Sequence, residues 1–230
     1  MTTVRTNVLC LIFIAITIAV AAYLYPSLPD QIPTHWNIKG EVDDYTPKPW
    51  GVMILPLAAV FVFVIMKLIP VISPKGFRTD QFRGVVNIFT VTLVGFMSAV
   101  ALLVLFAALG HDVHINEVVF AGVGLLFIVL GNYFGKVRKN FFIGIRTPWT
   151  LASDEVWNRT HRLGGWIFVL IGFFMFLNAF VRFPEGWLIG SIVAVALVPV
   201  VYSYVLYRRI EGFEEEDPDN TNSRVRSDEL

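Results

Sequence analysis

The sequence has little cysteine, little histidine and little charge. Cys10 is the only cysteine among 230 residues, so no disulfide bond within the chain stabilises a loop. Charged residues make up 16% of the chain and hydrophobic residues 56%, which exceeds the roughly 45–50% apolar content of soluble domains. A GxSxG motif, a CxxC pair and an HExxH motif are all missing. The composition excludes an ordinary soluble domain, and the missing motifs argue against an enzyme.

Charge is absent above all from six long apolar runs. An α-helix rises about 1.5 Å per residue, so roughly 20 residues cross the hydrocarbon core of a bilayer. The runs do not alternate between apolar and polar residues, as the strands of a membrane β-barrel would. Lys67 is the one charged residue within them, and it lies close enough to the end of its run to reach the interface. We predict an all-α integral membrane protein with six transmembrane helices, from the runs at residues 8–25, 51–72, 85–110, 118–134, 163–181 and 187–207.

The first run allows two interpretations. Arg5, the apolar run and the small residues Ala19-Val20-Ala21 resemble a cleavable signal peptide. The run continues to Tyr25, however, and ends in aromatic residues that suit a membrane interface. We favour an uncleaved span, and cleavage would remove one helix without changing the orientation of the others.

Lys and Arg residues are distributed unevenly between the two sides of the predicted bundle. All but three of the 18 lie in or beside the two termini and the segments after the second and fourth runs. The three on the other side are Lys39, Lys48 and Arg182. Because positive residues stay in the cytoplasm, both termini are predicted to be cytoplasmic and the loop after the first run extracellular. The formal net charge of zero conceals this asymmetry.

The predicted extracellular loop, residues 26–50, is rich in proline, which prevents a long helix. Residues 34–38 can form a short strand, and Gly40 with Glu41 a turn. Loops of this length without regular structure are uncommon unless they are functional. The loop is therefore either a solvated connector or a rigid cap that contacts a ligand, and we favour the cap.

The predicted cytoplasmic segment before the fifth run is unusually polar and aromatic. Its start is basic, residues 136–139, and residues 144–149 (GIRTPW) are typical of a turn. Ser153 is a good N-cap for a helix that continues into the fifth run. On that helix Trp157, His161, Gly164 and Phe168 share one face, and Glu155, Arg159 and Arg162 the other. We predict a re-entrant turn followed by an amphipathic entry to the span.

Two segments resemble known families. NFFIGIRTPWTLASDEVWNRTHRLGG is similar to the signature of the SdpI family of membrane immunity proteins, N-x-x-x-G-[IV]-R-T-P-W-[TA]-x-x-[DS]-x-x-x-W-x-x-[TA]-[HN]-R. The matching residues are Asn140, Gly144, Arg146, Thr147, Pro148, Trp149, Trp157, His161 and Arg162. The outer loop, LPDQIPTHWNIKGEVDDYTPK, resembles the short domain often fused in front of it, with the pattern P-x-H-[WF]-[ND]-x-x-G-x-[VP]-D. Its matching residues are Pro33, His35, Trp36, Asn37, Gly40 and Asp43.

The resemblance implies a multi-pass plasma-membrane protein that protects its producer against a secreted, membrane-active peptide toxin. It also implies signalling through a small transcriptional repressor held on the cytoplasmic side. The expected partners are the lipid bilayer, the toxin and the repressor, whereas no cofactor, no metal ion and no direct nucleic-acid contact are expected. The implied units are residues 1–80 with the outer loop, an SdpI-like four-helix unit at 81–210, and a disordered acidic tail at 211–230.

Arg146 has three plausible roles beside a membrane. Its guanidinium could bind a lipid phosphate, present the turn to a cytoplasmic protein, or donate hydrogen bonds to backbone carbonyl groups of the turn. We favour the last role, in which the planar guanidinium bonds two carbonyl groups at once.

Two other classes of function remain open. The sequence His111-Asp112-Val113-His114, with Glu117 and His35, suggests a metal-dependent membrane enzyme, but it lacks the HExxH glutamate. A transporter needs ionisable groups near the bilayer midplane, where the predicted spans offer Asn87, Asn178 and scattered hydroxyl groups. These polar residues, with Gly131-x-x-x-Gly135 and Gly186-x-x-x-Gly190, are more typical of helix packing.

Overall fold

A computed structural model describes residues 1–37, 39–75, 79–181 and 183–213. Arg78 and Arg182, which contribute to the charge asymmetry, lie outside the described residues. So do residues 214–230, most of the tail for which disorder is predicted.

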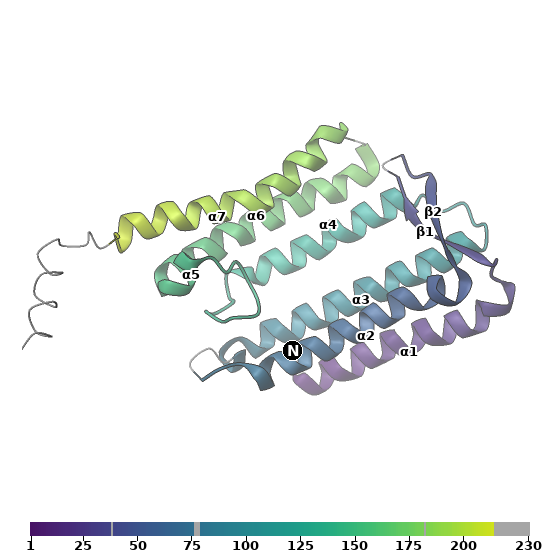
Figure 1. Cartoon of the computed structure of the whole chain (residues 1–230), viewed down its shortest axis with the longest axis horizontal. Coiled ribbons are helices and arrows are strands. Elements are labelled where there is room, and N and C mark those ends of the chain that lie inside the picture. Colours follow the sequence, from purple (N-terminus) through teal and green to yellow (C-terminus); the bar gives the residue numbers. More distant parts are fainter. Residues whose placement is uncertain (38, 76–78, 182, 214–230) are drawn as a thin grey trace, which may run out of the picture.

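The described residues form six long helices, one short helix and a two-stranded hairpin (Figure 1). In chain order the elements are α1 (Thr3–Leu24), β1 (Gln31–Trp36), β2 (Val42–Pro47), α2 (Lys48–Ile72), α3 (Arg83–Ala108), α4 (Ile115–Phe134), α5 (Pro148–Ala152), α6 (Asp154–Val181) and α7 (Glu185–Ile210). Single 3₁₀ turns follow α1 at Tyr25–Ser27 and precede α3 at Thr79–Phe82.

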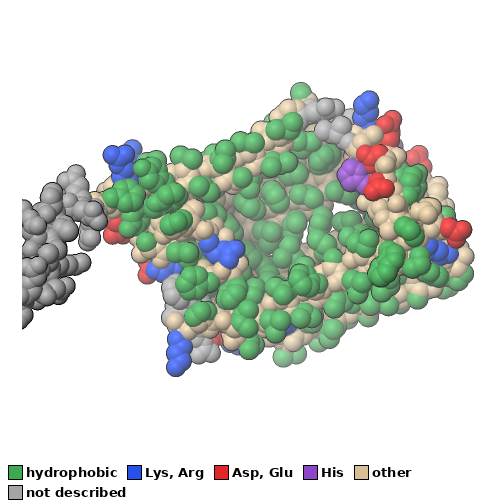
Figure 2. Space-filling view, viewed as in Figure 1, with side chains coloured by type: hydrophobic (Ala, Val, Ile, Leu, Met, Phe, Trp, Pro, Cys, Tyr) green, Lys and Arg blue, Asp and Glu red, His purple; other side chains and the backbone are tan. Residues whose placement is uncertain are grey.

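The six long helices are each long and apolar enough to cross a membrane. This confirms the prediction of an all-α, multi-pass membrane protein. Helices suit the bilayer core because their backbone N–H and C=O groups are hydrogen-bonded within the segment. Their outer surface is apolar: Phe61 is 65% exposed and Ile192 70%, and hydrophobic side chains cover the length of the bundle (Figure 2). In a bilayer these side chains contact acyl chains.

The helices lie in two groups (Figure 1). One group contains α1, α2 and α3, and the other contains α4, α6 and α7. The groups meet where α3 packs on α4 and through a buried cluster that includes Met66, Phe89, Phe134, Val137 and Trp157. Elsewhere the space-filling view shows a hollow between them, lined with hydrophobic side chains (Figure 2). The two groups of helices are therefore in contact at this cluster and where α3 packs on α4, and they are separated at the hollow.

Helices α4 and α6 approach each other closely at two pairs of glycines. A Cβ atom on Gly131 would lie 2.7 Å from the carbonyl oxygen of Gly165, and a Cβ atom on Gly124 would lie 2.6 Å from that of Gly172. Only glycine allows such a close crossing of helices. The expected packing role of Gly186-x-x-x-Gly190 is wrong within the described residues, because no atom lies within 4 Å of a Cβ at either glycine.

The two segments that resemble known families lie at opposite ends of the bundle. Figure 1 places the hairpin at one end, and α5, the N-terminus and the end of α7 at the other. In the hairpin, Ile32 pairs with Thr46 and Trp36 with Val42 in antiparallel register. The predicted strand is present but begins earlier, at Gln31. Its partner β2 was not predicted, since the sequence VDDYTP has two aspartates and a proline, which strands disfavour.

Candidate functional site

Asn140 organises the loop between α4 and α5. Its side chain is fully buried. The amide nitrogen donates to the carbonyl oxygens of Arg138 and Ile143, at 2.8 and 2.9 Å. The amide oxygen accepts hydrogen bonds from the backbone N–H groups of Phe142 and Ile143, at 2.8 and 2.7 Å. Asparagine suits this position because its short amide reaches nearby backbone donors and acceptors together.

His161 fixes the following part of the same loop. Its imidazole is fully buried, and its Nε2 accepts a hydrogen bond from the N–H of Ile145 at 3.0 Å. Because Nε2 accepts, the ring proton lies on Nδ1 and is donated to the carbonyl oxygen of Trp157 at 2.8 Å. A Cβ atom on Gly144 would lie 2.2 Å from Nε2, and Gly144 has a φ of +119°. Both the available space and the backbone conformation therefore require glycine at 144.

The two tryptophans of the SdpI-like segment from Asn140 to Arg162, here called the inner motif, contact different helices. Trp157 is fully buried, stacks on His161 with ring centroids 4.0 Å apart, and donates from Nε1 to the carbonyl oxygen of Val137 at 2.8 Å. Trp149 is partly buried and meets Tyr204 of α7 edge-on, with ring centroids 5.0 Å apart. The motif thus connects the loop to α6 through one ring and to α7 through the other.

Thr147 starts the short helix α5. Its hydroxyl accepts a hydrogen bond from the N–H of Thr150, while the Thr150 hydroxyl accepts from the N–H of Thr147. Pro148 occupies the first helical position, where a missing N–H group is not needed. The Thr147 and Ser203 hydroxyl oxygens lie 3.0 Å apart, so α5 is also hydrogen-bonded to α7.

Arg146 and Arg162 are exposed. Arg146 donates from Nη1 to the carbonyl oxygen of Phe141, so the expected bond to a turn carbonyl is present. Within the part of the chain that the structure describes, this guanidinium makes one such bond and not two. Arg162 lies on the charged face of α6, where Glu155 and Arg159 form an ion pair at 2.5 Å. Exposed pairs of this kind contribute about 0–1 kcal/mol to stability.

Asn37 forms the turn of the outer hairpin. Its side-chain oxygen accepts hydrogen bonds from the N–H groups of Lys39 and Glu41, at 2.9 and 3.1 Å, and its nitrogen donates to the Glu41 carboxylate at 2.9 Å. Gly40 has a φ of +84°, a conformation that favours glycine. The N-x-x-G part of the pattern from Pro33 to Asp43, here called the outer motif, is thus a turn built from local hydrogen bonds.

His35 and Asp43 face each other across the hairpin. The imidazole Nδ1 and the carboxylate Oδ1 are 2.5 Å apart, and both side chains are exposed. Pro33 is buried and Trp36 partly buried, so they point toward the bundle. The structure therefore joins two of the outer-motif residues in a polar pair and uses two others to seat the hairpin.

The hairpin is attached to three helices. Ile32 is fully buried against α2, where a Cβ atom on Gly51 would lie 2.6 Å from the Ile32 Cβ. The side chain of Asn116 in α4 donates to the carbonyl oxygen of Asn37 at 3.1 Å. β1 also packs against α3. These contacts hold the hairpin over both groups of helices.

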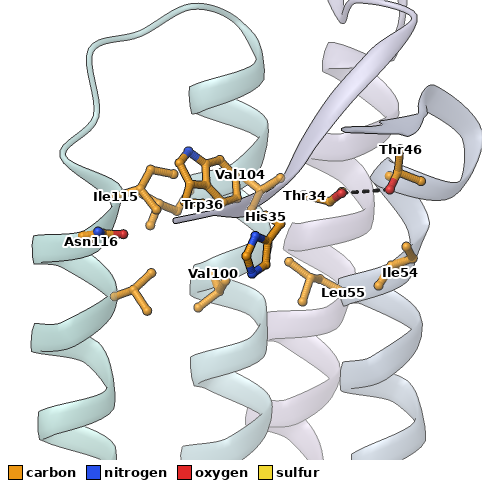
Figure 3. Close-up of a pocket in the computed structure, with 13 residues that line it drawn as sticks. Thr34, His35, Trp36, Thr46, Ile54, Leu55, Val100, Val104, Ile115 and Asn116 are labelled. Carbon is orange, nitrogen blue, oxygen red and sulfur yellow. Dashed lines mark hydrogen bonds between the residues drawn. The ribbon is translucent and has the colours of Figure 1, made fainter. Parts of the chain in front are cut away.

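A cavity of about 420 Å³ lies beneath the hairpin. Its lower walls are apolar side chains of α2, α3 and α4, among them Leu55, Val100 and Val119. Figure 3 shows Thr34, His35 and Thr46 of the hairpin above Leu55 and Val100, and a hydrogen bond of 2.8 Å joins the Thr34 and Thr46 hydroxyl oxygens. The cavity falls within the roughly 300–1,000 Å³ of ligand pockets.

The structure gives little support to the sites of the two alternative functions. His111, Asp112 and His114 lie in the exposed part of the α3–α4 connection, and the described residues contain no group of three or more His, Cys, Asp or Glu that could hold a metal. Asn87 donates to the Met1 carbonyl oxygen at 3.1 Å, and Asn178 accepts from the Phe183 N–H at 2.6 Å. Both asparagines have hydrogen-bond partners near the ends of helices.

Several contributors to the two sites were not predicted. They are Thr150 and Ser203 at the inner turn, Thr34, Thr46 and Asn116 at the cavity, and the glycines Gly124, Gly165 and Gly172 of α4 and α6. The seven-residue spacing of Gly124 and Gly131, and of Gly165 and Gly172, is visible in the sequence. A hydroxyl such as Ser203 has no comparable signal, because its partner is distant in sequence.

Comparison with known proteins agrees with the resemblance to the SdpI family. The SdpI/YfhL protein family matches residues 136–204, and a domain of unknown function (DUF1648) matches residues 12–60. The chain is 24% identical over 212 residues to the immunity protein SdpI of Bacillus subtilis (strain 168), an alignment that covers 90% of this chain and 99% of that protein. No solved structure matches the chain. The inner match contains the whole Asn140–His161 network.

Proposed function

From the match of residues 136–204 to the SdpI/YfhL protein family, we propose that this chain is a membrane immunity protein. It protects the cell in which it is made against a secreted, membrane-active peptide toxin. The observation that carries the proposal is the alignment with immunity protein SdpI over nearly the whole of both chains. A likeness confined to the inner motif would support only a common turn.

The proposed orientation places the hairpin outside and the α5 end of the bundle in the cytoplasm. It rests on the asymmetry of Lys and Arg, which cluster near the end that holds the N-terminus and α5. In this orientation the hairpin is the part of the chain that a secreted peptide meets first. The division into a unit at residues 1–80, a unit at 81–210 and a tail from 211 stays a prediction.

The outer-motif residues serve in this proposal as a rigid sensing cap. The His35–Asp43 pair and the Asn37 turn keep the hairpin in one shape, and Asn116 and Gly51 position it on the helices. A preorganised cap loses little conformational entropy when it binds a peptide. Rigidity of the hairpin thus favours recognition.

The inner turn serves mainly to hold the helices together, and its exposed edge is available to a cytoplasmic partner. Asn140, His161 and Thr147 direct their polar atoms inward and are buried. Arg146 and Pro148 are exposed at the same turn. We assign a small transcriptional repressor to this edge as the second partner, which requires no enzymatic chemistry. The protein acts as a binder and not as an enzyme in this account.

Co-culture tests the proposal. The chain is expressed in a Bacillus subtilis strain that lacks immunity protein SdpI, and the strain is grown beside its parent. We expect survival above that of the empty-vector strain, and loss of protection in His35→Ala and Asp43→Ala at an unchanged amount of protein in the membrane.

Asp30→Ala is the matched control, since Asp30 lies in the same outer segment and accepts a hydrogen bond from the Lys48 N–H through its backbone carbonyl oxygen. This variant should protect like the wild type. Equal killing of the wild-type and empty-vector strains, with the protein present in the membrane, would contradict the proposed function against that toxin.

A further inference from the structure

The lining of the cavity beneath the hairpin combines a few polar groups with many apolar side chains. Thr34, His35 and Asn116 provide hydroxyl, imidazole and amide groups at the level of the hairpin. Most of the remaining wall is apolar and includes Leu55 of α2, Leu103 of α3 and Val119 of α4. A ligand that fits this lining is amphipathic, with both apolar side chains and polar groups.

The hairpin beside the cavity carries an excess of negative charge. Glu41, Asp43 and Asp44 are exposed there, and Figure 2 shows acidic side chains next to a histidine at the edge of the hollow. The outer loop has two lysines, Lys39 and Lys48, and Lys48 offsets this negative charge less than Lys39. Lys48 donates from Nζ to the carbonyl oxygen of Leu28 at 2.7 Å and lies 4.6 Å from the centre of the Tyr25 ring. Its charge is therefore held at the base of the hairpin.

The carboxylates of Asp43 and Glu41 can still accept hydrogen bonds from a ligand. One oxygen of Asp43 lies against His35, and one oxygen of Glu41 accepts from Asn37. Each ionised carboxylate has about four acceptor positions, so the other oxygen of each can accept from an ammonium or guanidinium group. An anionic headgroup would instead be repelled by this rim.

We infer that the cavity binds the apolar side chains of a cationic amphipathic peptide, whose basic groups lie at Asp43 and Glu41. The inference rests on the proposed function, because it names the chemical class of the toxin that the cap recognises. The inference also places the bound peptide between the two groups of helices, since α2 and α3 form one wall of the cavity and α4 forms the other. A bound peptide therefore contacts both groups at once.

Peptide binding to the purified full-length chain tests this inference. The chain is placed in nanodiscs of phosphatidylcholine, whose headgroups carry no net charge, and titrated with a fluorescent peptide of leucine and lysine that forms an amphipathic helix. A leucine–glutamate peptide of the same pattern is the charge-reversed probe. We expect the lysine peptide to bind more tightly than it binds empty nanodiscs, and the glutamate peptide to bind no better than it binds them.

Two variants reduce the cavity from opposite walls. Leu103→Trp in α3 and Val119→Phe in α4 should each weaken binding of the lysine peptide by about tenfold or more, because each excludes an apolar side chain from the cavity. Ile192→Trp, at a position 70% exposed on α7, is the matched control and should bind like the wild type. Asp43→Asn should weaken binding of the lysine peptide, because one carboxylate of the rim is lost.

Equal affinities of the wild type and of a folded cavity variant would overturn the inference, as would equal affinity for the two peptides. A phospholipid that stays bound in native mass spectrometry, is lost in Leu103→Trp and excludes the peptide would assign the cavity to lipid instead. The co-culture test separates the two proposals. Protection without cavity-dependent peptide binding would leave the proposed function standing, and binding without protection would leave only the cavity assignment.

Discussion

Replacing Asn140 by alanine removes four hydrogen bonds at one buried position. Two carbonyl oxygens and two backbone N–H groups lose their partner, while α4 and α6 are unchanged in sequence. Each hydrogen bond contributes about 0.5–1.5 kcal/mol net, so four contribute about 4 kcal/mol, and water entering the vacated space returns part of it. We expect the free energy of unfolding to fall by about 3 kcal/mol.

The measurement is thermal unfolding of the purified chain in detergent, followed by loss of tertiary structure. For chains of about this length 1 kcal/mol corresponds to a melting-temperature change of about 2–4 °C, so Asn140→Ala should melt about 6–12 °C below the wild type. Asn140→Asp should lose at least as much, because a carboxylate would face the carbonyl oxygens of Arg138 and Ile143.

Asn158→Ala provides the comparison, since Asn158 is exposed on α6. Its melting temperature should match that of the wild type. A melting temperature for Asn140→Ala within about 2 °C of this control would refute the view that the buried amide holds the loop.

Three further outcomes are expected. Gly144→Ala should destabilise the chain by more than about 2 kcal/mol, because the new Cβ meets His161 and the backbone is left-handed. Gly84→Ala should not, since no atom lies within 4 Å of a Cβ at that position. Equal melting temperatures of the two variants would contradict this. Arg146→Lys should retain more stability than Arg146→Ala, because lysine can also donate to the one carbonyl group that Arg146 reaches, and identical melting of the two variants would argue against that bond. On a Cys10→Ala background, a membrane-impermeant thiol reagent added to intact cells should label Lys39→Cys and not Asn158→Cys, and the reverse pattern would overturn the proposed orientation.

The membrane-spanning helices could be predicted because their signal is local and one-dimensional. A run of apolar residues without charge has no other stable place than a bilayer or a buried core. The same holds for the inward face of α6, where the helical period puts Trp157 and His161 on one side, and both are fully buried. The Glu155–Arg159 pair follows from the same period.

The contacts that give the candidate sites their shape depend on residues far apart in sequence. Thr147 meets Ser203 across 56 positions, and Asn116 meets Asn37 across 79. Neither pair has a local signal. Strand β2 was missed for another reason: its polar sequence is stabilised by pairing with β1, whose buried Ile32 seats the hairpin on α2. Tertiary contact here overrides weak strand propensity.

The most direct test of the proposed function is the membrane potential of cells that express the chain. Cells of a strain without immunity protein SdpI carry either the chain or an empty vector, are loaded with a potential-sensitive dye, and are exposed to concentrated medium from the parent strain. A membrane immunity protein should keep the potential near its resting value while the empty-vector cells depolarise. Depolarisation at the same rate in both, with the chain present in the membrane, would contradict the account.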